Sequence, residues 1–276
     1  MTTGELPRGT GLDQDGCFVR EGSLERVPAA FAPVVAGLTA AVAARFAPGR
    51  VLSTYLYGSI PRGTAVPGVS DLDALLVLRD GPTGADRAAA RAAEAALDAA
   101  FPQIDGAGIL LMARERLLSE AERYDGAWFT ACLCTPLRGP DVTAALPRYR
   151  PTSLLARETN GDLHRRLPDL RRRAAAATGR ERVRLTRGVC RNLVRTGFTL
   201  VMPRWGGWTS DLAASAEVFA RYYPERAAPM RAAARAGRDP AAYPALLDEL
   251  LNGLAPWLAE EYLAVHGAKA LRPEET

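Results

Sequence analysis

The pattern of apolar residues changes near residue 146, and this change limits what the chain can fold into. Before it, short apolar runs typical of strands alternate with Ala-rich segments of helical spacing. After it, the segments have helical patterns interrupted by Gly or Pro, and none is a convincing strand. We therefore predict an α/β (α+β) domain with a mixed sheet over residues 1–146, followed by an all-helical domain over residues 147–276.

The predicted elements follow from these patterns. In the first part we expect strands at 51–57, 72–79, 107–112 and 127–138, and helices at 84–100 and 114–124. In the second part we expect helices at 152–176, 181–202, 211–223, 226–236 and 241–265. The uncharged stretch 27–44 has the length of a membrane span, but its Ala, Gly and Pro content favours a helix packed under a sheet. The polar first 15 residues lack the basic start of a signal peptide, so we expect a cytoplasmic protein that does not interact with membranes.

Charge is distributed unevenly along the chain. Residues 1–140 have a net charge of −3 and residues 141–276 a net charge of +7, with 14 arginines against 4 acidic residues in 148–195. The basic residues comprise 34 arginines and a single lysine, which indicates codon bias for most of them. Even so, the net negative charge of the first part favours binding of cations, and the net positive charge of the second favours binding of phosphates. Only four cysteines and two histidines argue against a disulfide framework and a zinc site.

The segment Tyr57–Leu78, YGSIPRGTAVPGVSDLDALLVL, is the one that indicates chemistry. A strand ends at Gly58 and Ser59, where glycine permits a tight turn and the N–H groups of a new helix can bind an anion. Eleven residues separate Ser59 from Asp71, and Asp73 follows at the start of the next strand. Side chains at i and i+2 of a strand point to the same side. The two carboxylates can therefore share Mg²⁺ ions that also bind a triphosphate.

These residues resemble the nucleotidyltransferases of the DNA polymerase beta superfamily, in particular the small bacterial members that include aminoglycoside adenylyltransferases. The residues that match the family pattern are Gly58, Ser59, Asp71 and Asp73, together with Arg62-Gly63-Thr64 and Ser70. The resemblance implies nucleotide binding by Gly58, Ser59, Arg62 and Ser70, and metal binding by Asp71 and Asp73. It also implies ATP or another NTP as co-substrate, two Mg²⁺ ions, and release of pyrophosphate.

A third carboxylate on a later strand is also implied by the resemblance. We predict Asp105 for this role, as metal ligand and catalytic group, because in strand parity it falls with residues 107, 109 and 111. A different register places Gly108 there instead, and the base must then come from elsewhere or the enzyme is impaired. Glu158 and Asp211 are further candidates for a base, although an ion pair at the surface explains Glu158 and a helix N-cap explains Asp211.

Several other side chains have both a functional and a structural interpretation. Trp205 and Trp208 suit the wall of a nucleotide or acceptor pocket, and equally suit buried aromatic packing. Four arginines recur at helical spacing, and one or two of them suit contact with phosphate: Arg184, Arg187, Arg191 and Arg195. Cys132 and Cys134 fall on one face of a predicted strand and are interpreted as small core residues.

The sequence therefore predicts an Mg²⁺-dependent enzyme that transfers a nucleoside monophosphate to a hydroxyl group. By resemblance the nucleotide is ATP, and the acceptor is a small molecule such as an aminoglycoside-like antibiotic or a metabolite. Aminoglycosides are polycations, however, and the helical part has a net charge of +7. RNA or protein acceptors, as in toxin–antitoxin nucleotidyltransferases, are the alternative, and a catalytically impaired nucleotide-binding relative is a third interpretation.

Overall fold

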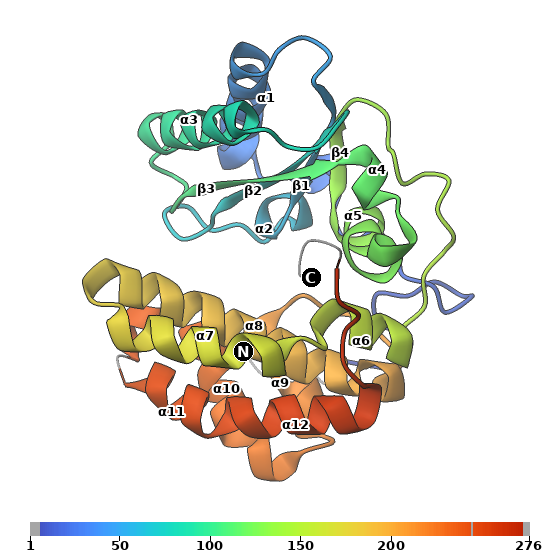
Figure 1. The fold of residues 1–276 in the computed structure, drawn as a ribbon, viewed down its shortest axis with the longest axis vertical. Helices are drawn as coiled ribbons and strands as arrows, with labels where there is room; N and C mark the ends of the chain where they lie inside the picture. Colours follow the sequence, from blue (N-terminus) through green and yellow to red (C-terminus); the bar gives the residue numbers. More distant parts are fainter. Residues whose placement is uncertain (1–5, 244, 273–276) are drawn as a thin grey trace. The chain divides into compact units, whose positions relative to one another are not determined.

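The computed structural model describes residues 6–243 and 245–272, which form two compact units. One unit comprises residues 19–148, and the other combines residues 6–18 with residues 149–272. The first contains a four-stranded mixed sheet with helices, and the second is helical (Figure 1). This confirms the predicted order of an α/β part followed by a helical part.

The sheet of the first unit has the strand order β3-β2-β1-β4. Its strands are β1 (Val51–Tyr57), β2 (Leu72–Leu78), β3 (Ala107–Ala113) and β4 (Thr135–Arg138). β1 is antiparallel to both β2 and β4, whereas β3 is parallel to β2. Because β2 lies inside the sheet with both faces covered, its sequence is an almost continuous apolar run.

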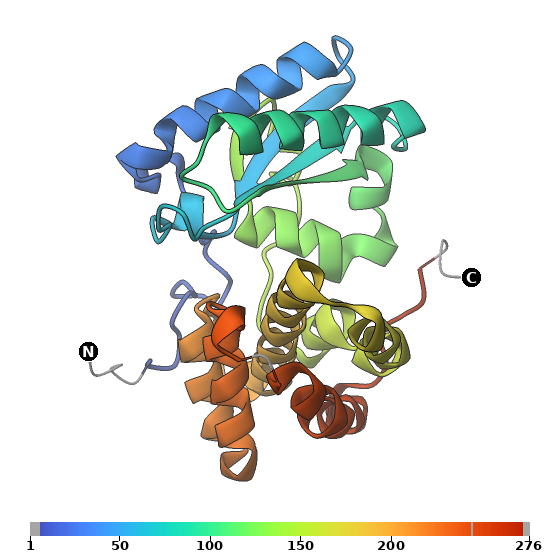
Figure 2. The same ribbon diagram turned by 90° about the vertical axis from the view of Figure 1, so that its left-hand side faces the viewer.

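Two helices cover one face of this sheet, as Figure 2 shows. They are α1 (Ala32–Arg45) and α3 (Gly84–Ala100), which also pack against each other. Alternate residues of β2 enter their core: Leu72, Ala74, Leu76 and Leu78. Residues Leu75 and Val77 point to the opposite face and pack with Tyr55. The position of Asp73 in this alternation places its side chain on the face of Leu75 and Val77.

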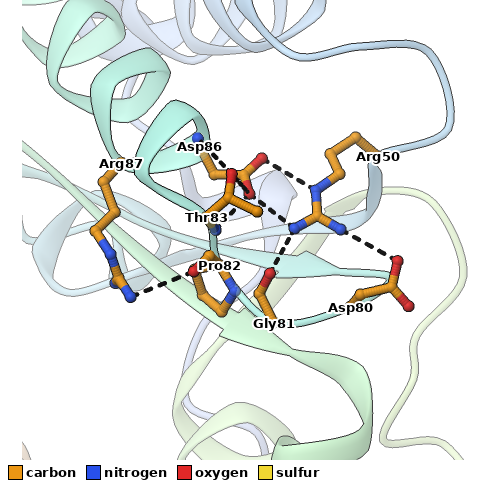
Figure 3. A network of polar contacts seen from close by, with 7 residues as sticks. All are labelled: Arg50, Asp80, Gly81, Pro82, Thr83, Asp86 and Arg87. Carbon is orange, nitrogen blue, oxygen red and sulfur yellow. Dashed lines mark hydrogen bonds and ion pairs between the residues drawn. The ribbon is translucent and has the colours of Figure 1, made fainter.

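The connection between β2 and α3 is held by a charged network (Figure 3). Thr83 is the N-cap of α3, and Asp86 completes a capping box with it. The guanidinium of Arg50, the residue before β1, donates to both carboxylate oxygens of Asp86 at 3.0 and 2.7 Å and to Gly81 O at 2.6 Å. These contacts fix the start of β1, the end of β2 and the start of α3 relative to one another.

The predicted strand 127–138 is partly wrong. Its first half forms α5 (Trp128–Leu133), and only its last four residues form β4. Thr130 Oγ1 donates to Gly126 O at 2.7 Å, the i→i−4 contact of a helix. The predicted helix 114–124 is not continuous. It forms α4 (Arg114–Leu117) and a separate 3₁₀ turn at Glu120–Glu122.

The second unit contains seven α-helices in its described residues. They are α6 (Ser153–Asn160), α7 (Leu163–Ala176), α8 (Gly179–Trp205), α9 (Leu212–Ala220), α10 (Ala227–Ala236), α11 (Leu246–Asn252) and α12 (Leu254–His266). The predicted helix 152–176 is interrupted at Gly161, and the predicted helix 241–265 is interrupted at Gly253. Pro244, inside the latter prediction, lies outside the described residues. α8 is the central helix, since it is buried almost all round over its last ten residues.

The segment 6–18 belongs to the helical unit through backbone contacts after α8. Gly9 N–H donates to Gly206 O at 2.8 Å, and Trp208 N–H donates to Thr10 O at 2.7 Å. The Phe18 ring meets Trp208 edge to face at 5.6 Å between centroids. Within residues 6–243 and 245–272, no helix has the length and apolar character needed to cross a membrane, and this includes α1 in the uncharged stretch.

Candidate active site

The end of β1 and the start of β2 bring together the two parts of the predicted motif. Tyr57 pairs with Asp73 across the antiparallel strands, so Gly58 comes next to the Asp73 side chain. Gly58 has φ +82°, and a Cβ built there would lie 2.5 Å from Asp73 Oδ2. The backbone conformation therefore favours glycine at this position, and a side chain here would displace the Asp73 carboxylate.

The turn after Gly58 is held by the core of the first unit. A short helix, α2 (Ser59–Arg62), begins directly after Gly58 and ends at Gly63, which has φ +76°. Its second residue, Ile60, is only 1% exposed and packs into the core that contains Leu72. Thr64 N–H donates to Ser59 O at 3.0 Å. The Gly58–Ser59 turn is thus fixed relative to β2.

Two of the predicted nucleotide-binding residues have partners within the protein. The Arg62 guanidinium lies 3.6 Å from the carboxylate of Glu21. The Ser70 hydroxyl accepts a hydrogen bond from Val66 N–H at 2.9 Å and so closes the loop that leads to Asp71. Both residues shape the surroundings of the turn, and their binding of nucleotide stays a prediction.

The parity argument for Asp105 is wrong. β2 and β3 pair in a register that places Gly108 beside Asp73. The residues grouped with Asp105 by strand alternation, at 107, 109 and 111, therefore point to the opposite face of the sheet. The side chains of Ile109 and Leu111 pack in the core on the α1–α3 face, away from the face of Asp73. Asp105 is exposed and precedes β3, where its N–H donates to Ser70 O at 3.1 Å.

Gly108 is the residue of β3 next to Asp73, since a Cβ built there would lie 3.8 Å from Asp73 Oδ1. Because this residue is a glycine, β3 provides no carboxylate at that position. Across residues 6–243 and 245–272, no three His, Cys, Asp or Glu side chains gather as a group that could hold a metal ion. Asp73 thus lies beside Gly58 and Gly108, Asp71 directly precedes β2, and the predicted set of three metal-binding carboxylates is not found as a group among the described residues.

A buried thiol that sequence reasoning did not connect with the site, Cys134, lies within electrostatic range of Asp73 and of Arg20. Burial raises the pKa of the Cys134 thiol, with Arg20 opposing this effect and Asp73 adding to it. Cys134 is fully buried beside Leu75 and Val77, so its role as a small core residue is confirmed, as is that of Cys132. The two cysteines do not share a strand, because Cys132 lies in α5. No sequence motif contains Arg20, and its place follows from tertiary packing alone.

The candidate bases in the helical unit have structural roles. Asp211 is the N-cap of α9, where its carboxylate accepts from Ala214 N–H at 2.8 Å and forms an ion pair with Arg238. This confirms the N-cap interpretation. Glu158 is an ion-pair partner but not at the surface: it is 7% exposed and lies 3.2 Å from the guanidinium of Arg272, itself 4% exposed.

The two tryptophans are packed in a buried aromatic cluster. Trp205 and Trp208 each meet Phe198 edge to face, at 5.7 and 5.4 Å between ring centroids. They are 1% and 9% exposed, which agrees with the packing interpretation. The predicted arginine row on α8 is divided between two environments, because Arg191 Nε donates to Gly237 O at 2.9 Å whereas Arg184 lines a cavity against α7.

No family model matches the chain, and no curated protein is significantly similar to it in sequence. The resemblance to nucleotidyltransferases therefore depends on the Tyr57–Leu78 segment and on the geometry that this segment adopts.

Proposed function

We propose that this protein is an Mg²⁺-dependent nucleotidyltransferase, which transfers a nucleoside monophosphate from ATP or another NTP to a hydroxyl of a small-molecule acceptor and releases pyrophosphate. The observation that carries the proposal is that Gly58 lies beside the carboxylate of Asp73, so close that a Cβ built on Gly58 would be 2.5 Å from Asp73 Oδ2, with Asp71 two residues before Asp73. Phosphoryl-type transfer depends mainly on positioning and charge neutralisation, so a rigid turn beside two carboxylates supplies its main requirements.

The donor set at β2 fits magnesium. Mg²⁺ prefers oxygen ligands and is commonly bound by one or two carboxylates together with substrate phosphates. Asp71 and Asp73 would hold it, and the missing side chain at Gly58 leaves the Asp73 carboxylate accessible to phosphate oxygens. When bound, Mg²⁺ neutralises part of the triphosphate charge. Gly58 and Ser59 would orient the phosphates through the backbone N–H groups and hydroxyl at the turn, while the buried Ile60 keeps the turn in place.

The acceptor side of the proposed site is shaped by β3. Leu110 follows Gly108 on the same face of the strand and is 49% exposed, so it offers an apolar contact beside the carboxylates. This contact and the basic helical part favour a neutral or anionic hydroxylated acceptor over a polycation. The same arginine excess is the observation that favours RNA or protein acceptors as the second candidate function. Gly108 at the third-carboxylate position is the observation that favours an impaired, nucleotide-binding relative.

A pyrophosphate-release assay tests the proposal. We expect the wild type to release pyrophosphate from α-labelled NTPs with Mg²⁺ and a library of hydroxylated antibiotics and metabolites. Asp71→Asn with Asp73→Asn is expected to abolish release, because both metal-binding carboxylates are lost. The matched control is Glu25→Gln with Glu115→Gln, which removes the same charge from two exposed positions of the same unit. Label that enters RNA or protein instead would establish the second candidate, and nucleotide binding without turnover would establish the third.

A further inference from the structure

A cavity of about 390 Å³ lies between α7 and α8 in the helical unit. The two helices form a hairpin joined by residues 177–178, and Figure 1 shows them side by side. Arginines from both helices line the cavity: Arg166 and Arg173 from α7, and Arg184 from α8. Its volume falls in the range of small-molecule sites, about 300–1,000 Å³.

The charge of the cavity lining is positive. Three arginines face a single acidic residue, Glu181. For Arg173 and Arg184, no carboxylate lies within ion-pair distance among the residues that the structure describes, and Arg166 has only a 3.8 Å contact with Asp162. Some arginines elsewhere in this unit are tightly paired, as Arg231 is with Glu217 at 2.7 Å. Guanidinium groups that outnumber the carboxylates around a cavity favour an anion, phosphate above all.

One position on α8 adds a second requirement on the ligand. Asn192 lines the cavity, but its Oδ1 has almost no accessible surface, so a ligand in the cavity does not reach this atom. Gly188 also lines the cavity, and a Cβ built there would meet no atom within 4 Å. The space above α8 at this position is therefore open.

We propose that the α7–α8 cavity binds a small phosphate monoester, a sugar phosphate or a mononucleotide. The arginines bind the phosphate, and Gly188 leaves room for the sugar ring. This site is independent of the proposed transfer reaction, since it shares none of the residues assigned to that reaction.

Calorimetric titration of the full chain with ribose 5-phosphate and with AMP tests the site. The titrations are made in EDTA, where metal-dependent binding to Asp71 and Asp73 is absent. We expect Arg173→Gln with Arg184→Gln to weaken binding at least tenfold, because two phosphate ligands are lost. Gly188→Leu is expected to abolish binding by filling the cavity while raising the melting temperature, because leucine favours helix more than glycine does.

The matched control is Arg172→Gln with Arg180→Gln, which removes the same charge from the same two helices outside the cavity lining. Binding should be unchanged in this control and in Asp71→Asn with Asp73→Asn. Binding of AMP alone assigns the site to mononucleotides, and binding of ribose 5-phosphate alone assigns it to sugar phosphates. The proposal is overturned if neither probe binds, if Gly188→Leu binds as the wild type does, or if only a single-stranded RNA oligonucleotide binds.

Discussion

At the scale of single residues, Gly58 is the position where sequence and structure agree most closely. Residues with a Cβ rarely adopt its positive φ, and a Cβ there would lie 2.5 Å from Asp73 Oδ2 and displace that carboxylate. That this turn lies beside Asp73 could be predicted because the parts are local: a strand end, a turn and the start of the next strand lie within 22 residues.

The third carboxylate could not be predicted in this way, since it depends on strand register. Leu72 N–H donates to Gly106 O at 2.8 Å, and this bond decides that Gly108 and not Asp105 comes beside Asp73. A shift of one residue in the pairing of β3 with β2 would move every side chain of β3 to the other face of the sheet. Because β3 is an apolar run, its sequence does not indicate which of the two registers forms. Tertiary pairing alone distinguishes them.

Gly108→Asp tests this register directly. The new carboxylate would start 3.8 Å from Asp73 Oδ1, so like-charge repulsion should lower the melting temperature without metal. Mg²⁺ should then stabilise the variant more than it stabilises the wild type. Thermal unfolding with and without Mg²⁺ measures both effects. Gly106→Asp is the control, and an equal response of the two variants to Mg²⁺ would contradict the register.

At the scale of elements, the sheet was predicted best where strands are bounded by clear turns. β1, β2 and β3 follow Gly, Pro or Asp signals, and their predicted ranges agree with the structure to within one residue. Residues 128–133 were not predictable because a short apolar run fits a buried strand and a buried helix equally well. Their helix is decided by packing, including the edge-to-face contact between Phe129 and Tyr57 at 5.0 Å.

The network at the start of α3 predicts a pH-dependent stability. Hydrogen bonds from Arg50 hold the pKa of Asp86 well below its ordinary value of 3.8, with Thr83 adding to the effect against the cost of burial. A lowered carboxyl pKa stabilises the fold above the unfolded-state pKa, and this stabilisation is lost as the pH falls through the folded-state pKa.

We therefore expect Asp86→Asn to lower the free energy of unfolding at pH 7 by about 2 kcal/mol, the contribution of hydrogen bonds to a charged group. The difference from the wild type should shrink as the pH falls below 3.8. Urea denaturation at pH 7 and at pH 2.5 measures it. Asp80→Asn is the control, since Asp80 is an exposed partner of the same arginine. An undiminished difference at pH 2.5 would refute the assigned cause.

At the scale of the whole molecule, the charge step along the sequence coincides with a structural division. The α/β unit contains Asp71 and Asp73, and the helical unit contains the arginine-rich segment. The sequence did not predict that residues 6–18 belong to the helical unit, because their contacts with Gly206 and Trp208 join positions almost 200 residues apart. Such contacts leave no periodic pattern in the sequence.

Phe18→Ala tests the place of this segment. Phe18 is 8% exposed against Trp208, so its truncation should destabilise the helical unit by about 3 kcal/mol. Hydrogen exchange should then increase in the last turns of α8 and leave the strands of the sheet protected. Leu24→Ala, at an exposed position of the other unit, is the control. Loss of protection confined to the sheet would contradict the assignment.

The central claim is that the Gly58 turn and the Asp71–Asp73 pair bind a nucleoside triphosphate through Mg²⁺. Calorimetric titration of the full chain with α,β-methylene ATP, with Mg²⁺ and with EDTA, tests it most directly. We expect one nucleotide bound per chain with Mg²⁺, little heat in EDTA, and loss of the Mg²⁺-dependent binding in Asp71→Asn with Asp73→Asn. Absence of Mg²⁺-dependent binding for the analogues of all four common NTPs, or equal binding by the double variant, would contradict it.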